Sequence, residues 1–392
     1  MQPSARHIYL DNNATTPLDP RVLDDMLPFL SADFGNAAST SHSYGWRARS
    51  AVEKARADIA QAVHAAPEHD IVFTSGATES INLALKGLQP PTGKHHIVTS
   101  RIEHKAVLDS CHHLEQNGTA VTYVDVRPDG RIDLDQLSAA IGDHTYLVSI
   151  MWANNETGTL QDMAAIARLC HSRDVALHTD ATQALGKVDI DLDALDIDLA
   201  SFSAHKLYGP KGVGALYIHR RQRDRLRPLI HGGGHEQGLR SGTLNVPGIV
   251  GFASALQICV SEQPAERTRI ASLRKHLLGA ITSQLADVYV NGDQGHCLPG
   301  TLNMSFAHTD ADSILLEMPD IALSSGSACT SAKHAPSHVL KAMGVSDELA
   351  KASIRFGIGR FNTAEEVGYV AARCVSAVTR LRAMSPLYRQ TA

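Results

Sequence analysis

The chain has 392 residues, which is long enough to bury a large core in two domains or in one large one. Its composition, 43% hydrophobic and 20% charged, is typical of a globular protein. A formal net charge of -5 argues against nucleic acid or an anionic membrane as a partner, because both select basic surfaces. No apolar run approaches the ~20 residues that span a bilayer, and residues 1–11 lack a leader pattern. We therefore expect a cytoplasmic protein.

The six cysteines are scattered and form no C-x-x-C pair, so neither a disulfide framework nor a metal site is expected. A free cysteine in an apolar helical pattern behaves as a small hydrophobic residue. Four cysteines fit that description: Cys111, Cys170, Cys259 and Cys374. Cys297 and Cys329 lie instead in segments rich in Gly, Ser or Pro and are the two candidates for chemistry.

From about residue 50 to 220, helical and strand patterns alternate. Helical periodicity over 51–63 is followed by a short apolar run at 71–74, and a helix opens after Ser75-Gly76. Further buried strands are expected at 96–99, 121–124, 146–151, 175–179, 197–202 and 213–218. Such alternation predicts a mainly parallel sheet covered by helices on both faces. The link before 213–218 is too short for a crossover, so we expect that strand to run antiparallel.

After Gly232-Gly233-Gly234 the pattern changes. Residues 246–285 are largely helical, with Pro264 as the expected break, and strand-like pieces at 302–306 and 354–357 mix with helices near 337–343 and 364–384. We expect a boundary near 260–265. A large domain would span 15–262, and a smaller one would combine 1–14 with 263–392.

Three strand ends carry candidate functional residues, and ligands of parallel α/β sheets collect at such ends. The segment 74–80 can bind an anion at a helix start, or it can be a plain helix cap. Asp180 is either a strand-end cap or a charge in a crevice. Lys206 leaves an apolar strand for a tight turn, where desolvation frees an amine as a nucleophile; the alternative is a lysine that reaches solvent.

Together these residues resemble the cysteine desulfurases of the iron–sulfur cluster assembly group, which are fold-type I pyridoxal-phosphate (PLP) enzymes of the class V aminotransferase-like family. The matching stretches run in order along the chain: 9–16, 34–36, 74–80, 103–104, 154–158, 178–183, 203–212, 231–243, 324–331 and 353–361. The resemblance implies an α/β fold with a mostly parallel seven-stranded sheet sandwiched by helices, plus a smaller α+β domain.

The resemblance also implies roles for individual residues. Lys206 would bind PLP covalently and move protons, Asp180 would pair with the pyridinium nitrogen, and Gln183 would hydrogen-bond the ring hydroxyl. His104 would stack on the ring and act as an acid or base; otherwise it is a histidine at a helix start. The phosphate would be bound by Ala77, Thr78, Ser203, His205 and, across a homodimer interface, Thr243.

The substrate L-cysteine would be bound by Asn13, Asn155 and Arg355, although Arg355 could instead be a structural ion-pair partner. Cys329 decides the reaction, because its small polar neighbours suit an accessible thiol. It would receive the sulfur as a persulfide and pass it to an acceptor protein. A selenocysteine lyase or an aminotransferase of the same fold is the alternative, and a sulfur-carrier scaffold without turnover is a more distant one.

The sequence leaves the acceptor open among an iron–sulfur scaffold, nitrogenase-type clusters, tRNA thiolation and DNA phosphorothioation. A basic run between 220 and 227 could dock an acidic partner, although a solvated helix face explains it more simply.

Overall fold

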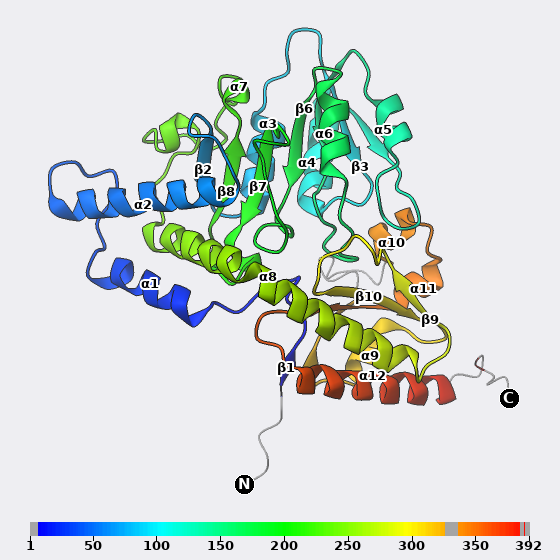
Figure 1. Ribbon diagram of the computed structural model, residues 1–392. Coiled ribbons are helices and arrows are strands. Elements are labelled where there is room, and N and C mark those ends of the chain that lie inside the picture. The colour runs from blue at the N-terminus through cyan, green and yellow to red at the C-terminus, as the bar shows by residue number, and fades with distance from the viewer. Residues whose placement is uncertain (1–6, 326–335, 385–387, 389–392) are drawn as a thin grey trace.

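The computed structural model describes residues 7–325, 336–384 and 388. In them the short apolar runs form a seven-stranded sheet in the order β2-β8-β7-β6-β5-β3-β4 (Figure 1). The pairs among β3 to β7 are parallel, whereas β8 is antiparallel to both β2 and β7. The mostly parallel sheet and its reversed last strand are therefore confirmed. The strands are β2 (Asp70–Thr74), β3 (His96–Ser100), β4 (Ala120–Val124), β5 (Thr145–Ser149), β6 (Ala176–Asp180), β7 (Leu199–Ser203) and β8 (Gly214–Ile218).

Helices cover both faces of this sheet, because successive strand residues point to opposite sides and both sides are apolar. Val98 packs in one hydrophobic cluster with α2, α6 and the first part of α8, while its neighbour Ile97 packs in another with α3 and α4. The helices of this region are α1 (Pro20–Ser31), α2 (Ser43–Ala62), α3 (Ala77–Gly87), α4 (Lys105–Gln116), α5 (Leu134–Ala140), α6 (Met163–His171), α7 (Arg220–Arg223) and α8 (Val246–Thr282).

The C-terminal region has its own sheet and its own hydrophobic cluster. The strand order is β12-β13-β10-β9, and a separate parallel pair joins β1 to β11. Ile8 and Leu10 belong to this cluster, which supports our proposal that residues 1–14 belong with 263–392. The elements are β1 (Ile8–Tyr9), β9 (Val288–Asn291), β10 (Thr301–Phe306), β11 (Ile321–Ala322), β12 (Ser324–Ser325), β13 (Ser353–Gly357), α9 (Ala311–Leu316), α10 (His338–Ala342), α11 (Asp347–Lys351) and α12 (Ala364–Met384).

The long helix α8 runs from one region to the other, as Figure 1 shows. The expected break at Pro264 is wrong, because the helix continues through it to Thr282. A proline inside a helix removes one backbone donor, and here the two parts of the helix are each held by a hydrophobic cluster. Its buried residues up to Cys259 pack in the first cluster, and those from Ile270 onward pack in the second. That change supports the proposed domain boundary near residue 262.

The basic run at 220–227 is helical only over Arg220–Arg223, and its exposed arginines, Arg220, Arg221 and Arg227, agree with a solvated face, although the run also makes contacts within the chain. Arg221 binds Asp198 at 2.5 Å, and Arg223 pairs with Asp70. The four cysteines expected in helical apolar patterns are buried and free, as predicted. Among the described helices, none combines the length and the apolar character that crossing a membrane would require.

Candidate active site

A cavity of about 580 Å³ opens at the carboxyl ends of β2, β6 and β7. Its volume lies within the range of about 300–1,000 Å³ that small-molecule sites occupy. All the predicted site residues except Thr243 and Cys329 line it: Asn13, Ala77, Thr78, His104, Asn155, Asp180, Gln183, Ser203, His205, Lys206 and Arg355. The fold thus brings together residues from both ends of the chain at the edge where parallel sheets bind ligands.

Lys206 ends the short 3-10 turn Ala204–Lys206 that follows β7. Its Nζ donates to the backbone carbonyls of Asn13 at 2.7 Å and Ala14 at 2.6 Å. The same N-terminal loop is tied to the lysine turn a second time, because the backbone N–H of Thr16 donates to the carbonyl of His205 at 3.0 Å. The amine is therefore fixed inside the cavity and does not reach solvent along the protein surface.

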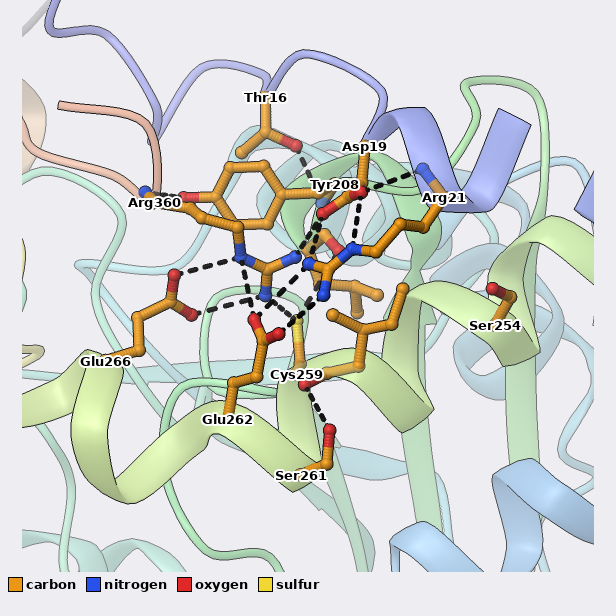
Figure 2. A network of polar contacts seen from close by, with 12 residues as sticks. Thr16, Asp19, Arg21, Tyr208, Ser254, Cys259, Ser261, Glu262, Glu266 and Arg360 are labelled. Carbon is orange, nitrogen blue, oxygen red and sulfur yellow. Dashed lines mark hydrogen bonds and ion pairs between the residues drawn. The ribbon is translucent and has the colours of Figure 1, made fainter. Parts of the chain in front are cut away.

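An ionic network surrounds Arg360 next to Tyr208 (Figure 2). Arg360, which follows β13, contacts Asp19 at 2.8 Å and Glu266 of α8 at 2.9 Å. The Arg360 guanidinium also lies over the Tyr208 ring, 4.4 Å from its centroid. Tyr208 stands two residues after Lys206 and has a φ of 66°, which is unusual for a bulky side chain. The network therefore ties the segment that follows Lys206 to three other parts of the chain, which contain Asp19, Glu266 and Arg360.

Asp180 is the last residue of β6 and is only 6% exposed. Its Oδ1 accepts the backbone N–H of Thr182 at 3.0 Å. Two residues earlier, burial lowers the pKa of His178 to about 4, so this ring is neutral between the hydroxyls of Ser149 and Ser201. The carboxyl group of Asp180 is thus the ionisable group that this strand end presents to the cavity.

The start of α3 forms one wall of the cavity. Gly76 precedes it with a φ of 152°, and no described side chain caps the first N–H groups of the helix. Backbone donors of this kind, together with the helix dipole, bind anions. His205 lies opposite, where burial, with a smaller contribution from Lys206, lowers its pKa to about 4 and leaves a neutral imidazole. Ser203 supplies a hydroxyl to the same wall.

The close approach of β8 to this wall depends on Gly214. A Cβ at this position would lie 2.4 Å from the carbonyl oxygen of Phe202 and 2.6 Å from the Cα of Gly76. Only glycine fits there without moving the loop that begins α3.

His104 is the N-cap of α4, and its Nδ1 accepts the backbone N–H of Ala106 at 3.1 Å. This contact leaves the ring proton on Nε2 in the neutral form. The histidine therefore caps the helix, as one of the two alternatives has it, and it also lines the cavity. Next to it, burial raises the pKa of Glu103 to about 8, and its Oε1 accepts the N–H of Met151 at 2.9 Å.

Arg355 enters the cavity from β13 with a side chain that is 6% exposed. Its Nη2 contacts Asp11 Oδ1 at 2.8 Å, and its Nη1 donates to the carbonyl of Asn155 at 3.0 Å. Its Nε is buried without a partner among the described residues. Arg355 is thus an ion-pair partner and also a cavity residue. The sequence interpretation missed Asp11, which is 344 residues away along the chain.

Two predicted residues are not among the described residues that line the cavity. Thr243 is exposed, although the neighbouring Arg240 reaches Glu79 of α3 at 2.8 Å. Cys329 lies outside the described residues. The last described residues before that gap pair with β13, with Ser324 opposite Arg355.

The arrangement combines a partly buried amine, a carboxyl group, an anion-binding helix start and a guanidinium around one space. It can hold a flat anionic cofactor together with an amino-acid carboxylate. The chain belongs to the class V aminotransferase family, which it matches over residues 8–370.

Individual relatives are similar over nearly the whole chain. The cysteine desulfurase IscS of Rickettsia bellii is 51% identical over 383 residues, covering 97% of this chain and 93% of the relative. The human cysteine desulfurase is 51% identical over 388 residues, covering 98% of this chain and 85% of the relative. Among solved structures, a NifS-like protein superposes with a TM-score of 0.88 and 39% identity, covering 95% of this chain and all of that one.

Proposed function

We propose that this chain is a PLP-dependent cysteine desulfurase that converts L-cysteine to L-alanine and retains the sulfur as a persulfide on Cys329. The observation that carries the proposal is the convergence of Lys206, Asp180 and Arg355 on one cavity at the sheet edge. The names of the relatives, which are cysteine desulfurases over nearly the full length, support the substrate.

PLP fits the donors and acceptors of the cavity. Its phosphate requires N–H and hydroxyl donors, which the start of α3, Ser203 and His205 offer. Its pyridinium nitrogen requires a carboxylate, which Asp180 offers. The buried hydroxyl of Thr182 has no partner among the described residues and lines the same cavity, so a bound group can satisfy it. When bound, PLP withdraws electrons from the substrate α-carbon.

The residues of the chain perform the remaining work. Arg355 binds the substrate carboxylate, for which its planar fork is suited, and Asn13 and Asn155 orient the substrate beside it. Lys206 Nζ takes up the proton released from the substrate α-carbon. The neutral ring of His104 would stack on the bound cofactor, and its Nε2 is the atom through which it would exchange a proton.

Sulfur transfer is assigned to Cys329. Its Sγ bonds to the substrate sulfur as the Cβ–S bond of the substrate breaks, and the electron pair of that bond stays with the carbon fragment. Protonation of the fragment gives L-alanine, and Cys329 holds the sulfur as a persulfide. No external oxidant is required. The persulfide is then passed to an acceptor protein, and we propose iron–sulfur cluster assembly as its destination because the relatives include several named IscS.

The test uses purified, PLP-loaded protein. Cys329→Ser should keep the visible band of the bound cofactor and lose alanine release from L-cysteine. Cys297→Ser is the matched control, because this thiol is partly exposed but does not line the cavity, and it should retain turnover. Full turnover in Cys329→Ser would refute the assignment of the acceptor. Parallel assays with selenocysteine and with an oxo-acid acceptor separate the lyase and aminotransferase alternatives.

Lys206→Ala tests the covalent attachment. Borohydride should fix the cofactor to the wild-type chain and not to this variant. An undiminished adduct on another residue would contradict the role of Lys206.

A further inference from the structure

A second lysine lies behind Gln183. Lys187 Nζ donates to Gln183 Oε1 at 2.9 Å, and Gln183 Nε2 donates to the carbonyl of Asn13 at 2.9 Å. The same carbonyl accepts the Nζ of Lys206 at 2.7 Å. A continuous chain of hydrogen bonds thus joins the two lysines through one amide and one carbonyl.

This chain of contacts fixes which way the Gln183 amide faces. The Nζ of Lys187 donates to the amide oxygen of Gln183, and a backbone carbonyl only accepts hydrogen bonds. With Lys187 on one side and the Asn13 carbonyl on the other, only one orientation of the amide satisfies both contacts. That orientation directs the amide NH₂ toward the side of Asn13, which lines the reaction cavity as Gln183 itself does. One hydrogen of the NH₂ goes to the carbonyl, and the second is available to a bound molecule.

The Lys187 side chain projects away from that cavity into a second, smaller one. This rear cavity of about 40 Å³ is lined by residues that include Lys187, Lys206, Cys259 and Glu266. The volume has room for water, which needs about 10–15 Å³ per molecule. Lys206 and Asn13 line both cavities and therefore separate them.

The position is costly for a lysine. Burial lowers the pKa of Lys187 to about 7, with a further contribution from the like charge of Lys206 and smaller ones from other charges nearby. Lys187 forms no ion pair with the described residues, and its only hydrogen bond to them goes to Gln183. An amine in this partly buried position, without a counter-ion among the described residues, is destabilising relative to an apolar side chain. The hydrogen bond of Lys187 goes to the amide of Gln183, which lines the reaction cavity.

We propose that Lys187 is a positioning residue that holds the Gln183 amide with its N–H toward the ring hydroxyl of PLP. The inference rests on the proposed function, since it needs a cofactor in the cavity. It assigns no proton transfer and no substrate contact to Lys187. Its effect passes through Gln183 alone.

The experiment uses full-length protein loaded with PLP, and it follows the visible absorbance of the bound cofactor as a function of pH. Lys187→Met should shift the titration midpoint upward by about 0.5 pH units or more, because the deprotonated form of the cofactor loses a fixed donor. The dissociation constant for PLP should rise about five-fold, as expected for one weakened hydrogen bond. Lys187→Arg keeps a donor at the position and should restore both values toward wild type.

Stability is measured on the same samples. Methionine matches lysine in length and needs no solvation, so the melting temperature of Lys187→Met should not fall by more than a few degrees. If this variant does not fold, Lys187→Gln, which is neutral, shorter and a weaker donor, takes its place with the same expected direction of shift.

A double-mutant cycle decides whether Lys187 acts through Gln183. In a Gln183→Leu background, adding Lys187→Met should change neither the midpoint nor the affinity any further. Full additivity of the two changes would overturn the inference, as would an unshifted Lys187→Met variant. A wild-type chain that takes up no PLP would instead overturn the proposed function, and this inference with it.

Discussion

Arg355 is held between a carboxylate and a carbonyl before any substrate arrives. Asp11 and the Asn155 carbonyl take one hydrogen bond each and fix the plane of the guanidinium, while no described residue pairs with its Nε. A substrate carboxylate can therefore bind to a guanidinium group that is already oriented. Pre-organisation of this kind reduces the entropy lost on binding.

Arg355→Lys should raise the KM for L-cysteine at least about ten-fold, because an ammonium cannot replace a bidentate fork. Asp11→Asn should have a smaller effect in the same direction, since it loosens the orientation and leaves the fork in place. Steady-state kinetics with L-cysteine measure both. A variant that lowers kcat and leaves KM unchanged would contradict the assignment of the carboxylate to Arg355.

Asp19 contributes pH-dependent stability. Hydrogen bonds from Arg21, and a weaker one from Arg360, hold the pKa of Asp19 well below its ordinary value, so the folded protein binds this proton less readily than the unfolded chain. The resulting stabilisation is present above the ordinary pKa near 4 and is lost as pH falls toward the lower value. Asp19→Asn should cost about 3 kcal/mol at neutral pH, as expected for removing the charge from the buried Asp19–Arg360 pair.

Denaturant titrations of wild type and Asp19→Asn at several pH values measure the difference between their free energies of unfolding. This difference should become smaller as the pH falls below 4. Asp24→Asn is the matched control, because Asp24 is exposed on the same helix, and its variant should stay close to wild type throughout. If the free energy of unfolding of Asp19→Asn differed from that of wild type by the same amount at every pH, the charge of Asp19 would not be the source of the stabilisation.

At the scale of elements, the anion-binding wall at the start of α3 depends on how closely β8 can approach it. Gly214→Ala places a Cβ against Gly76 and the backbone of β7, so the loop must move. We expect the affinity for PLP to fall at least about ten-fold, since phosphate donors act only at hydrogen-bond distance. Gly279→Ala is the control, because no atom lies near its added Cβ within α8 and alanine favours a helix. Equilibrium dialysis of PLP compares the two variants, and equal affinities would contradict the packing argument.

The same elements indicate how much of the molecule the sequence could predict. Apolar runs such as 96–99 and 213–218 identify strands because burial on both faces leaves a continuous local pattern. The break at Pro264 was predicted wrongly, since the packing of α8 against two clusters overrides a local helix breaker. Lys206 and Asp180 could be found because strand ends are local features. The partner of Arg355 could not, because no periodicity connects Asp11 to a strand so far along the chain.

At the scale of the whole molecule, the surface of α1, α2 and the loop between them exposes large apolar side chains. Leu30 is 56% exposed, Phe34 68% and Trp46 56%. The rings of Phe34 and Tyr44 also lie 5.4 Å apart there, and contiguous exposed apolar surface of this kind marks interaction sites. Thr243 is exposed as well, and it does not line the cavity of its own chain. Both observations support the proposed homodimer, in which Thr243 of one protomer completes the phosphate site of the other.

Mixed dimers test that contribution across the interface. Thr243→Val alone should weaken PLP binding about ten-fold, the effect of one hydrogen bond to a charged group, and Lys206→Ala alone should abolish turnover. When the two variants are refolded or co-expressed together, each hybrid dimer contains one site with both an intact Lys206 and an intact Thr243 from the opposite protomer. Such a site should bind PLP with wild-type affinity and release alanine. If Thr243 served its own chain, no hybrid site would be complete, and tight PLP binding with turnover would not return at any mixing ratio.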